Sequence, residues 1–450
     1  MGKILIAVMN SVSFDARVRR QAATLRAAGY DVHIVGEKDA SCRAPRETWP
    51  NGVTVERVGL PHLLGRKARR AKTMRPSAKA TAASAGEPPL QPLIGADLGD
   101  LPRPLFALRH SGAPLEMLWF QARRRVRDVA VARRIAAHGP DLVHVHDVEA
   151  LPIGAFASRT SGAPLVFDAH EIYDQHAATK ASREAKRRRK THTIARFAAD
   201  VDGFVTINDS IAGYYRAHFP RLPEAVVVGN ATSPPPPGPY DGRLHEAAGL
   251  DRGTRIALYQ GKFLPRRNLP ELVETAAHLS PAWALVFMGW GDLKAELEAR
   301  RDALPAEARA RVRFVDPVPH GELLTWTAGA AVGVMPYDNH TLNHWFCTPN
   351  KLWEFPQAGV PILVSPFPEM RRRVEAHGHG WLLADPFDPR HTARLLESLD
   401  EAELGRARAA CARFNAADNW ELYEARLLAL YARLLERDAG EDRDQRKAAA

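Results

Sequence analysis

Short apolar runs alternate along the chain with segments whose apolar residues recur every three or four positions. The first run is Lys3–Met9; a polar loop and a helical segment that stops near Ala28 follow it, and the next run is Asp31–Val35. Apolar runs separated by such segments are typical of buried parallel strands joined by helices. This order predicts an α/β domain of the Rossmann type. Because no Gly-x-Gly-x-x-Gly motif follows the first strand, we do not expect a dinucleotide there.

The same order begins again in the second half of the chain. A proline-rich segment, Gly229–Pro239, has neither helical nor strand periodicity and separates the two halves. A loop is predicted at Gly261–Asn268. The strands predicted after the separating segment are Arg255–Gln260, Ala284–Met288, Val312–Val315, Ala331–Met335 and Ile362–Val364. We therefore expect an α/β protein with two Rossmann-like βα domains that face each other across a cleft.

Breaks in this pattern give the predicted domain boundaries. We expect an N-terminal domain over residues 1–232, with a mobile insertion at about 63–113 that is rich in Ala, Ser, Pro and Gly and basic at its start. A linker at 233–243 leads to a second domain over residues 244–413. A helix is expected at 414–437, and residues 438–450 are expected to form a disordered tail.

The formal charge of +10 over 450 residues favours anionic partners. Two basic runs, Arg123–Arg125 and Lys186–Lys190, each fit either a solvated helix face or peripheral contact with an anionic membrane. Neither run has the interleaved aromatic residues of a single-strand platform, so nucleic acid is not an expected partner. The three cysteines are too few for a disulfide framework or a zinc site, and no apolar run approaches the roughly 20 residues that span a bilayer. We expect a cytoplasmic protein, with contact to the inner face of the membrane as an open alternative.

Titratable residues gather where two successive predicted strands end. His146 and Asp147 follow the first of these strands, and Asp168, His170 and Glu171 follow the second. Side chains at the carboxyl ends of parallel strands are where α/β folds place their chemistry. The cluster therefore predicts a functional cleft. The same residue types could bind a metal ion, although we expect a site without one.

The stretch Cys347–Pro361 predicts a helix that begins at an anion-binding turn. Thr348 has the side chain of an N-cap, Pro349 fits the first helical position, and Gly359 follows the end. The free N–H groups and partial positive charge of a helix N-terminus suit a diphosphate. Glu354 lies about one and a half turns further on, where it could accept hydrogen bonds from sugar hydroxyls. Taken alone, the stretch fits an ordinary helix with a solvated glutamate equally well.

Several different short motifs occur in a fixed order along most of the chain. They are Asp15-Ala16-Arg17-Val18, Asp168-Ala169-His170-Glu171, Tyr259-Gln260-Gly261-Lys262 with Arg267-Asn268, Gly289-Trp290-Gly291, Pro319-His320 with Glu322-Leu323, and Pro349–Glu354 with Ala358–Pro361. In their order and spacing they resemble the motifs of glycosyltransferases of family 4, which have the GT-B fold. The resemblance extends from Asp15 to Pro361.

This resemblance implies transfer of a sugar from a UDP- or GDP-linked donor to an envelope, polysaccharide or lipid-linked acceptor, with retention of configuration and without metal or cofactor. It implies that the first domain binds the acceptor and the second the nucleotide sugar, and that the C-terminal helix crosses back to the first domain. Catalysis would fall to His170, beside the anomeric centre. The implied donor site comprises Gly261, Lys262, Arg267, Thr348, Pro349, Asn350, Lys351 and Glu354. The acceptor-side candidates are Asn10, Asp15, Arg17, His146, Asp147 and Glu171.

One position departs from the family motif of two glutamates separated by seven residues. Counting back from Glu354, the first position is Phe346 rather than glutamate, and His344 or Asn343 could replace some of the missing hydrogen bonds. Two other functions stay open: a sugar-nucleotide epimerase of the same fold and, because of Phe346, a non-catalytic protein that binds a nucleotide sugar. Turnover without an acceptor would indicate the first, and binding without transfer the second.

Overall fold

The structure is a computed structural model that describes residues 2–13, 15–38, 44–58, 128–129, 131–173, 180–232 and 238–440. The chain divides into two compact units: unit 1 is Met1–Val228 with Glu424–Ala450, and unit 2 is Gly229–Tyr423. The predicted insertion at about 63–113, residues 233–237 of the predicted linker, and the predicted tail beyond residue 440 lie outside the described residues.

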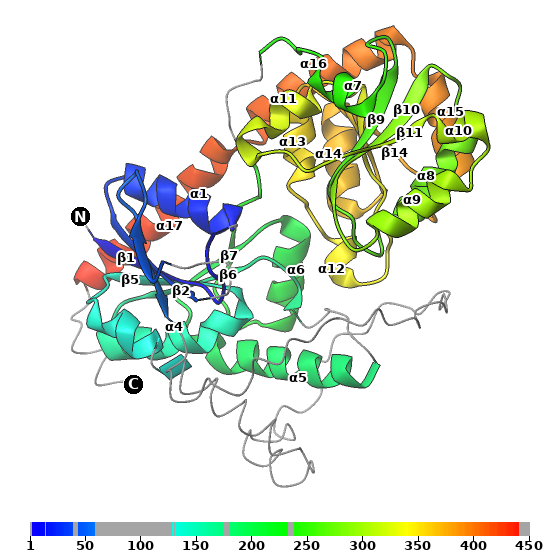
Figure 1. Ribbon diagram of the computed structural model, residues 1–450. Helices are drawn as coiled ribbons and strands as arrows, with labels where there is room; N and C mark the ends of the chain where they lie inside the picture. The colour runs from blue at the N-terminus through cyan, green and yellow to red at the C-terminus, as the bar shows by residue number, and fades with distance from the viewer. Residues whose placement is uncertain are drawn as a thin grey trace. The chain divides into compact units, whose positions relative to one another are not determined.

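The core of unit 1 is an eight-stranded sheet (Figure 1). Its strands, in the order in which they lie side by side, are β3 (Arg46–Thr48), β4 (Thr54–Val58), β2 (Asp31–Glu37), β1 (Lys3–Ala7), β5 (Leu142–His146), β6 (Leu165–Ala169), β7 (Gly203–Thr206) and β8 (Ala225–Val227). All pairs are parallel except β3 with β4. The sheet confirms the predicted Rossmann-like architecture. The pattern does not predict β3, because its residues are polar and none of them is buried.

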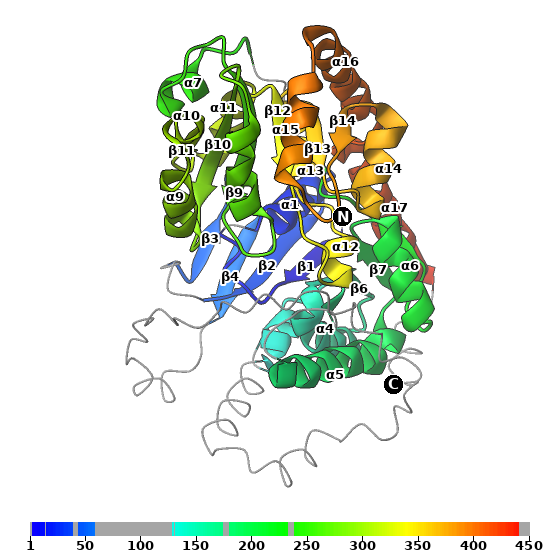
Figure 2. The same ribbon diagram turned by 90° about the vertical axis from the view of Figure 1, so that its right-hand side faces the viewer.

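Helices cover both faces of this sheet (Figures 1 and 2). One face carries α1 (Ala16–Ala27) and the part of α17 (Trp420–Gly440) that belongs to unit 1; the other carries α4 (Asp147–Ser161), backed by α5 (Lys180–Phe197). The turn η4 (Ala198–Asp200) and α6 (Asp209–His218) lie on either side of β7 in sequence. Thr24 of α1 donates a hydrogen bond to Glu424 of α17 (2.9 Å), and Leu434 lies against Gly203 of β7. From Glu424 onward, α17 is therefore part of the packing of unit 1.

The basic run on α5 is only partly solvated. Arg187 is buried, and so are Thr191 and Ile194, four and seven positions later. Residues at this spacing share one helix face, and α5 packs against α4. Lys190 also forms an ion pair with Glu149 of α4 (3.3 Å). The prediction of one solvated or membrane-facing side is thus wrong for Arg187 and Lys190, because the run is long enough to reach the packed face. The other basic run lies outside the described residues.

The core of unit 2 is a six-stranded, all-parallel sheet. Its strands, side by side, are β11 (Val312–Val315), β10 (Trp283–Trp290), β9 (Arg255–Lys262), β12 (Val332–Met335), β13 (Ile362–Val364) and β14 (Gly380–Leu382). Short apolar runs account for the first five of these in the sequence. The edge strand β14 is not predicted; it has the same length as β13, but its residues are only partly buried.

Helices also flank the sheet of unit 2. In chain order they are α7 (Arg243–Ala248), α8 (Leu269–Glu274), η5 (Thr275–His278), α9 (Lys294–Asp302), α10 (Ala306–Arg309), η6 (His320–Glu322), α11 (Leu323–Thr327), α12 (Leu342–Trp345), α13 (Lys351–Gln357), α14 (Pro368–His377), α15 (Pro389–Ser398) and α16 (Glu401–Ala417). α8 contacts α9 and α15, whereas α13 contacts α11 and α16. None of the helices in the described ranges of the two units is long and apolar enough to cross a membrane.

The end of β9 differs from its prediction. The strand continues for two residues beyond Gln260, and Gly261 pairs in register with Gly289 of β10. Both glycines have positive φ, 107° and 154°, and a Cβ on Gly289 would lie 2.0 Å from the Gly261 carbonyl oxygen. The prediction of a loop from Gly261 is therefore wrong for Gly261 and Lys262. Hydrophobic periodicity does not detect a strand end whose close backbone approach requires glycine.

The start of α13 also differs from its prediction. The helix begins at Lys351, Asn350 takes the N-cap position, and no side chain caps it. Pro349 only starts a turn, since its carbonyl accepts from Leu352 N (2.9 Å), while the first full helical bond joins Glu354 N to Asn350 O (3.0 Å). The prediction that Thr348 caps the helix is wrong. The capping threonine in this region is Thr341, which accepts from His344 N (3.2 Å) and begins the short helix α12.

The strand order of each sheet reverses at one point. In unit 1 the reversal lies between β1 and β5, and in unit 2 it lies between β9 and β12. In open α/β sheets, binding sites lie outside the carboxyl ends of the strands at such a switch point. The residues that follow β1, β5, β9 and β12 are therefore the expected location of binding and catalytic side chains.

Candidate functional site

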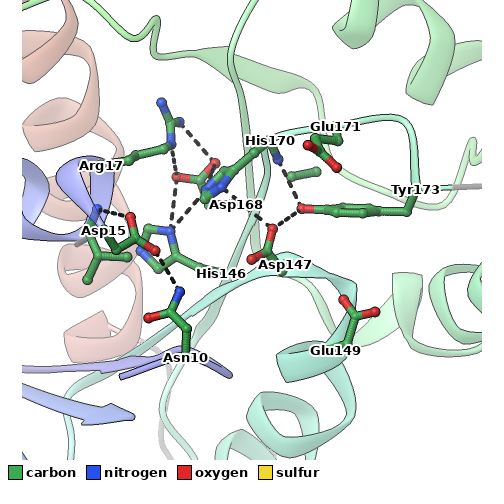
Figure 3. Close-up of polar contacts among 12 residues, drawn as sticks. Asn10, Asp15, Arg17, His146, Asp147, Glu149, Asp168, His170, Glu171 and Tyr173 are labelled. Atoms are coloured by element: carbon green, nitrogen blue, oxygen red, sulfur yellow. Dashed lines mark hydrogen bonds and ion pairs between the residues drawn. The ribbon is translucent and has the colours of Figure 1, made fainter. Parts of the chain in front are cut away.

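In unit 1 the switch point brings together the titratable residues that the sequence singles out (Figure 3). Asn10 follows β1, and Asp147 follows β5. In the register of β5 with β6, His146 pairs with Asp168, and His170 comes directly after β6. The prediction that two strand ends share one cluster is therefore correct at the level of geometry.

Asp168 is the buried centre of this cluster. Its two carboxylate oxygens accept from Arg17 Nη2 and Nε, both at 2.9 Å, and Gln21 Nε2 adds a bond of 2.8 Å. The third nitrogen of Arg17 donates to the carbonyl of Val228 (2.7 Å). Burial alone would favour the protonated acid, but the Arg17 guanidinium holds the pKa of Asp168 well below its usual range. Arg17 is buried and engaged on all three nitrogens, so the geometry favours a structural ion pair over the predicted acceptor-side role.

Three histidines are arranged around Asp168. The rings of His144 and His146 stack with centroids 4.4 Å apart, and His146 Nδ1 lies 3.1 Å from His170 Nε2. His144 Nδ1 shares a hydrogen bond of 2.5 Å with the hydroxyl of Tyr431 in α17. Burial lowers the pKa of His144 to about 4 and that of His146 well below its ordinary value. Both rings are therefore neutral near pH 7.

His170 differs from the other two histidines because part of its side chain, 19%, is exposed. Its Nε2 lies 3.4 Å from Asp168 Oδ1, and its Nδ1 lies 3.5 Å from Asp147 Oδ1. Burial opposes the charged ring, but the Asp168 carboxylate raises the pKa of His170 above its ordinary value. Asp147 is in turn fixed by the hydroxyl of Tyr173 (2.6 Å), which also accepts from His170 N (3.1 Å). The result is a partly exposed imidazole, held in one orientation between two carboxyl groups, whose charged form is favoured.

The remaining candidates in unit 1 lie at the edge of this cluster. Asp15 caps α1 by accepting from Val18 N (3.1 Å), and its other oxygen accepts from the side chain of Asn10 (2.8 Å). Both are thus tied to the loop after β1. The backbone carbonyl of Glu171 accepts from the hydroxyl of Tyr215 (2.8 Å). These contacts fix the residues at the edge of the cluster, where part of the His170 ring is exposed.

His144, His146 and Asp168 also offer three potential metal ligands within 4.8 Å of one another. The carboxylate of Asp168, however, already has its charge matched by the guanidinium of Arg17. A metal ion there would have to replace a bidentate ion pair, which is among the stronger contacts a carboxylate makes. The geometry therefore favours the ion pair.

In unit 2 the switch point lies beside the end of β9. Lys262 is exposed, and its side chain forms no ion pair within the described residues. Arg267 donates to the hydroxyl of Tyr337 (2.6 Å), and its guanidinium lies 4.6 Å from the centroid of that ring. Tyr337 comes from the loop after β12, so the two strands at the switch point hold Arg267 between them. Burial opposes its charge, but the tyrosines raise the pKa of Arg267 further.

Glu354 and Lys351 come from α13. Glu354 accepts from Gln260 Nε2 (2.9 Å), and the other end of that amide accepts from the hydroxyl of Thr327 (2.7 Å). The amine of Lys351 is buried, lies 4.1 Å above the ring of Tyr259, and has no hydrogen-bond partner among the described residues. Burial lowers the pKa of Lys351 well below its ordinary value. The glutamate is thus preorganised, whereas the amine is held without a counter-charge in direct contact.

The turn before α13 contains the other predicted donor residues. Thr348 is buried, and its carbonyl accepts from Asn230 (3.2 Å), whereas Asn350 is exposed. Phe346, which replaces the first glutamate of the motif, ends α12. His344 lies two positions earlier in the same helix. Burial lowers the pKa of His344 to about 4, so its ring is neutral and can form hydrogen bonds.

Several residues of the cluster around Asp168, and one of those beside the end of β9, were not among the predicted candidates. His144 stands two positions before His146 on the same strand and therefore on the same face, a signal present in the sequence. Gln21 stands one helical turn after Arg17, which is also readable. Tyr431 and Tyr337 reach their clusters from distant segments, and no spacing in the sequence indicates either contact.

Two family models match the chain. A glycosyl transferase 4-like domain matches residues 80–231, and glycosyl transferases group 1 matches residues 254–401. Among known proteins, D-inositol 3-phosphate glycosyltransferase 1 of Catenulispora acidiphila is 26% identical over 318 residues, which cover 67% of this chain and 74% of that protein.

Solved structures resemble the whole chain. Sucrose-phosphate synthase from Thermosynechococcus elongatus superposes with a TM-score of 0.67 at 18% identity, covering 97% of this chain and 100% of that one. HepE from Anabaena, solved in complex with UDP and glucose, has a TM-score of 0.64 at 14% identity, covering 96% of this chain and 100% of its own. At these identities the likeness establishes a shared fold.

Proposed function

Because the chain belongs to the glycosyltransferases with the GT-B fold and family 4 type, we propose that it transfers a sugar from a UDP-linked donor, with retention of configuration. The acceptor we propose is a hydroxyl of an envelope polysaccharide or a lipid-linked carbohydrate. The observation that carries the proposal is the arrangement at the end of β9, where the charged side chains of Lys262 and Arg267 and the buried amine of Lys351 lie with a preorganised Glu354.

The cations suit the chemistry of the leaving group. Breaking the bond between a sugar and a nucleoside diphosphate builds negative charge on the phosphate oxygens. Preorganised cations stabilise charge where it develops. Lys262 and Arg267 provide permanent positive charge, and Lys351 gains a proton when an anion approaches its buried amine. Since side chains supply this charge, we assign no metal ion and no further cofactor to the step.

Glu354 supplies donor recognition in this proposal. Its carboxylate is held by Gln260, which is itself held by Thr327, so the direction of the carboxylate is fixed. A carboxylate so held accepts hydrogen bonds from the adjacent hydroxyls of a ribose at little entropic cost. That HepE was solved with UDP supports a uridine nucleotide as the donor base.

His170 is the proposed catalytic residue of unit 1. Asp168 and Asp147 hold its ring on two sides and favour its charged form. A charged, partly exposed imidazole can donate a hydrogen bond to the reacting sugar and stabilise it there. The retaining outcome and the acceptor rest on the family type, and the following experiment tests donor use directly.

Thermal shifts and donor turnover should be measured with UDP-, GDP-, ADP- and TDP-glucose for the wild type, Lys262→Ala and Glu354→Gln. We expect a UDP-sugar to raise the melting temperature. Each substitution should weaken binding about 10- to 150-fold, since a hydrogen bond to a charged group contributes roughly 1.5–3 kcal/mol. The matched controls are Lys294→Ala, at a partly exposed position of α9, and Glu375→Gln, at an exposed position of α14; both should keep the wild-type response.

Each outcome discriminates between functions. If no nucleotide or nucleotide sugar stabilises the wild type, the proposed donor site is wrong. Binding without transfer or hydrolysis would favour the non-catalytic protein, to which Phe346 points. Conversion of one UDP-sugar into another without an acceptor would favour the epimerase.

A further inference from the structure

A second cluster of titratable residues lies in unit 1, away from the residues assigned to the donor and to catalysis. His33 is on β2, Glu56 is on the neighbouring strand β4, and His138 follows the helical residues 131–137. Glu56 Oε2 lies 3.8 Å from His33 Nε2 and 3.5 Å from His138 Nε2. All three potential ligand atoms lie within 4.8 Å of one another. Two imidazoles and one carboxylate therefore converge on one point.

The atoms that face this point have no other use within the described residues. His33 Nε2 and Glu56 Oε2 are buried and have no hydrogen-bond partner there. Their separation of 3.8 Å is too long for a hydrogen bond, whichever tautomer His33 adopts. Buried polar atoms are almost always paired, and two such atoms facing each other need an explanation.

The opposite edge of each buried side chain, in contrast, is firmly held. His33 Nδ1 shares a hydrogen bond of 2.5 Å with the hydroxyl of Thr54. Glu56 Oε1 accepts from Arg134 Nε (2.9 Å) and from Arg46 Nη2 (3.3 Å). Metal-binding histidines and carboxylates are usually fixed in this way, through the atom that does not bind the metal.

We propose that His33, Glu56 and His138 form a binding site for a divalent transition-metal ion, with Zn²⁺ as the preferred ion. Two imidazole nitrogens and one carboxylate oxygen are a donor set that suits zinc. Tetrahedral ligands at about 2.0–2.1 Å from zinc lie about 3.3–3.4 Å apart, so small side-chain shifts bring the present distances to that value. His138 is 30% exposed, which leaves room for water as a fourth ligand.

The protonation states support this assignment. Burial and the neighbouring His138 lower the pKa of His33 to about 4, so its ring is neutral and carries a free electron pair. Burial favours the protonated form of Glu56, but the hydrogen bonds and positive charges of Arg134 and Arg46 together outweigh it and lower the pKa of Glu56. Both groups are therefore in the form that binds a metal.

The other candidate group, around Asp168, lacks these features. There the guanidinium of Arg17 already meets both carboxylate oxygens. At Glu56 the two arginines contact only Oε1 and leave Oε2 facing the imidazoles. A metal ion at Glu56 would also join two points that are far apart in sequence, one on β4 and one at residue 138. We therefore expect the ion to stabilise unit 1.

The test is a titration of the full-length, chelator-treated protein with Zn²⁺ in competition with a chromophoric chelator. The wild type should bind one equivalent that both His33→Ala and His138→Ala lose. His391→Ala, which removes an exposed histidine of α15, should retain it. Zn²⁺ should raise the melting temperature of the wild type and of His391→Ala only. If His33→Ala does not fold, His138→Ala, at the more exposed position, decides the question.

A gentler pair of variants tests the supporting hydroxyl. Thr54→Val keeps the side-chain shape but removes the contact to His33 Nδ1, and it should weaken Zn²⁺ binding about 10- to 100-fold. Thr48→Val, at the paired position on β3, should leave the affinity unchanged. A wild type that binds no Zn²⁺, or a His138→Ala variant that binds it as tightly as the wild type, would overturn the proposal.

Discussion

Two arginine–aspartate pairs in unit 1 have nearly the same geometry but different surroundings. Arg17 and Asp168 form two bonds of 2.9 Å in the buried cluster, and Arg159 and Asp200 form bonds of 2.8 and 2.9 Å near the surface. Removing one partner of a buried pair leaves an uncompensated charge, which costs about 3–5 kcal/mol. We expect Asp168→Asn to lower the free energy of unfolding by that amount and Asp200→Asn by about 0–1 kcal/mol, measured by urea denaturation at pH 7.

The pH dependence of this difference has a defined sign. The folded protein holds the pKa of Asp168 well below its value in the unfolded chain, about 3.9. The unfolded state therefore binds a proton more readily, and the contribution of Asp168 is complete above that value and is lost as the pH falls below it. The gap between wild type and Asp168→Asn should shrink only below about pH 4. A gap that shrinks already between pH 7 and pH 5 would contradict the assignment.

Lys351 should have opposite effects on stability and on binding. Its buried amine lacks a hydrogen-bond partner among the described residues, and its pKa is lowered well below the ordinary value. Folding is thus opposed below the unfolded pKa of about 10.4, because the unfolded chain holds a proton that the folded protein does not. We expect Lys351→Met to raise the free energy of unfolding by about 1–3 kcal/mol and to weaken UDP binding about 10- to 150-fold.

Calorimetry can separate these two effects. UDP binding measured in buffers with different ionisation enthalpies should show proton uptake by the wild type at neutral pH and none by Lys351→Met. For the same reason the affinity of the wild type should fall as the pH rises. Lys294→Met, at a partly exposed position of α9, should change neither stability nor proton uptake. Equal proton uptake by wild type and Lys351→Met would show that another group takes up the proton.

At the residue scale, the sequence is a good guide to which residues lie close together and a poorer guide to their roles. His146, Asp168 and His170 can be placed together because parallel strands end at one edge of a sheet. Arg17 can be placed near them, but its burial and its contacts on three nitrogens depend on how α1 packs on the sheet. That packing is a tertiary feature that the sequence pattern does not show. It places Arg17 in an ion pair with Asp168, although the family motif would place Arg17 at the site that binds the sugar acceptor.

At the scale of elements, the glycines at the ends of β9 and β10 fix how closely these strands approach. Gly289 has a φ of 154°, and a Cβ there would meet the Gly261 carbonyl oxygen at 2.0 Å. Gly289→Ala combines backbone strain with a clash against main chain, and we expect it to lower the free energy of unfolding by about 2–5 kcal/mol. Urea denaturation of the full chain measures this change.

Gly405 provides the matched control. It lies inside α16, and a Cβ there would meet nothing within 4 Å. Alanine has the higher helix propensity, so Gly405→Ala should raise the free energy of unfolding by about 0.5–1 kcal/mol. If both alanine variants had the same effect, the close approach of β9 and β10 would not be the reason for the Gly-Trp-Gly motif.

Apolar runs make strands easier to predict than helix starts in this chain. The predicted strand Ile362–Val364 matches β13, because a buried parallel strand needs a continuous apolar run. The start of α13 is misplaced because Thr348 and Pro349 carry the side chains of a helix start. Whether Thr348 caps a helix depends on the hydrogen bonds of its side chain and carbonyl in the folded chain. Its carbonyl accepts a hydrogen bond from Asn230.

At the scale of the whole molecule, the repeated strand–helix order predicts two Rossmann-like sheets, and both are present. The order of strands within each sheet is not visible in the hydrophobic pattern. It depends on how the strands pair in the folded sheet; with right-handed connections, a reversal of the order places the following helices on the other face. That reversal creates the two switch points. The location of the residues around Asp168 and of those beside the end of β9 is therefore a property of the topology rather than of any one motif.

The same scale explains why the last helix matters to unit 1. Leu427, Leu430, Tyr431 and Leu434 of α17 are each at most 3% exposed. Burying one such side chain contributes about 1.5–3 kcal/mol, so the four together contribute about 6–12 kcal/mol. A whole domain is typically stable by only about 5–15 kcal/mol. A chain truncated after Tyr423 should therefore contain a folded unit 2 and an unfolded unit 1.

Limited proteolysis with mass spectrometry distinguishes the two units after this truncation. Fragments of Gly229–Tyr423 should remain protected, whereas Met1–Val228 should be cleaved rapidly, and a peptide of residues 420–440 added in trans should restore its protection. Truncation after Gly440 is the control, and it should leave the protection of both units unchanged. Equal protection of Met1–Val228 with and without α17 would mean that these four side chains contribute far less than their burial implies. In that case the strand residues against which they pack, Gly203 among them, would have to be covered in another way.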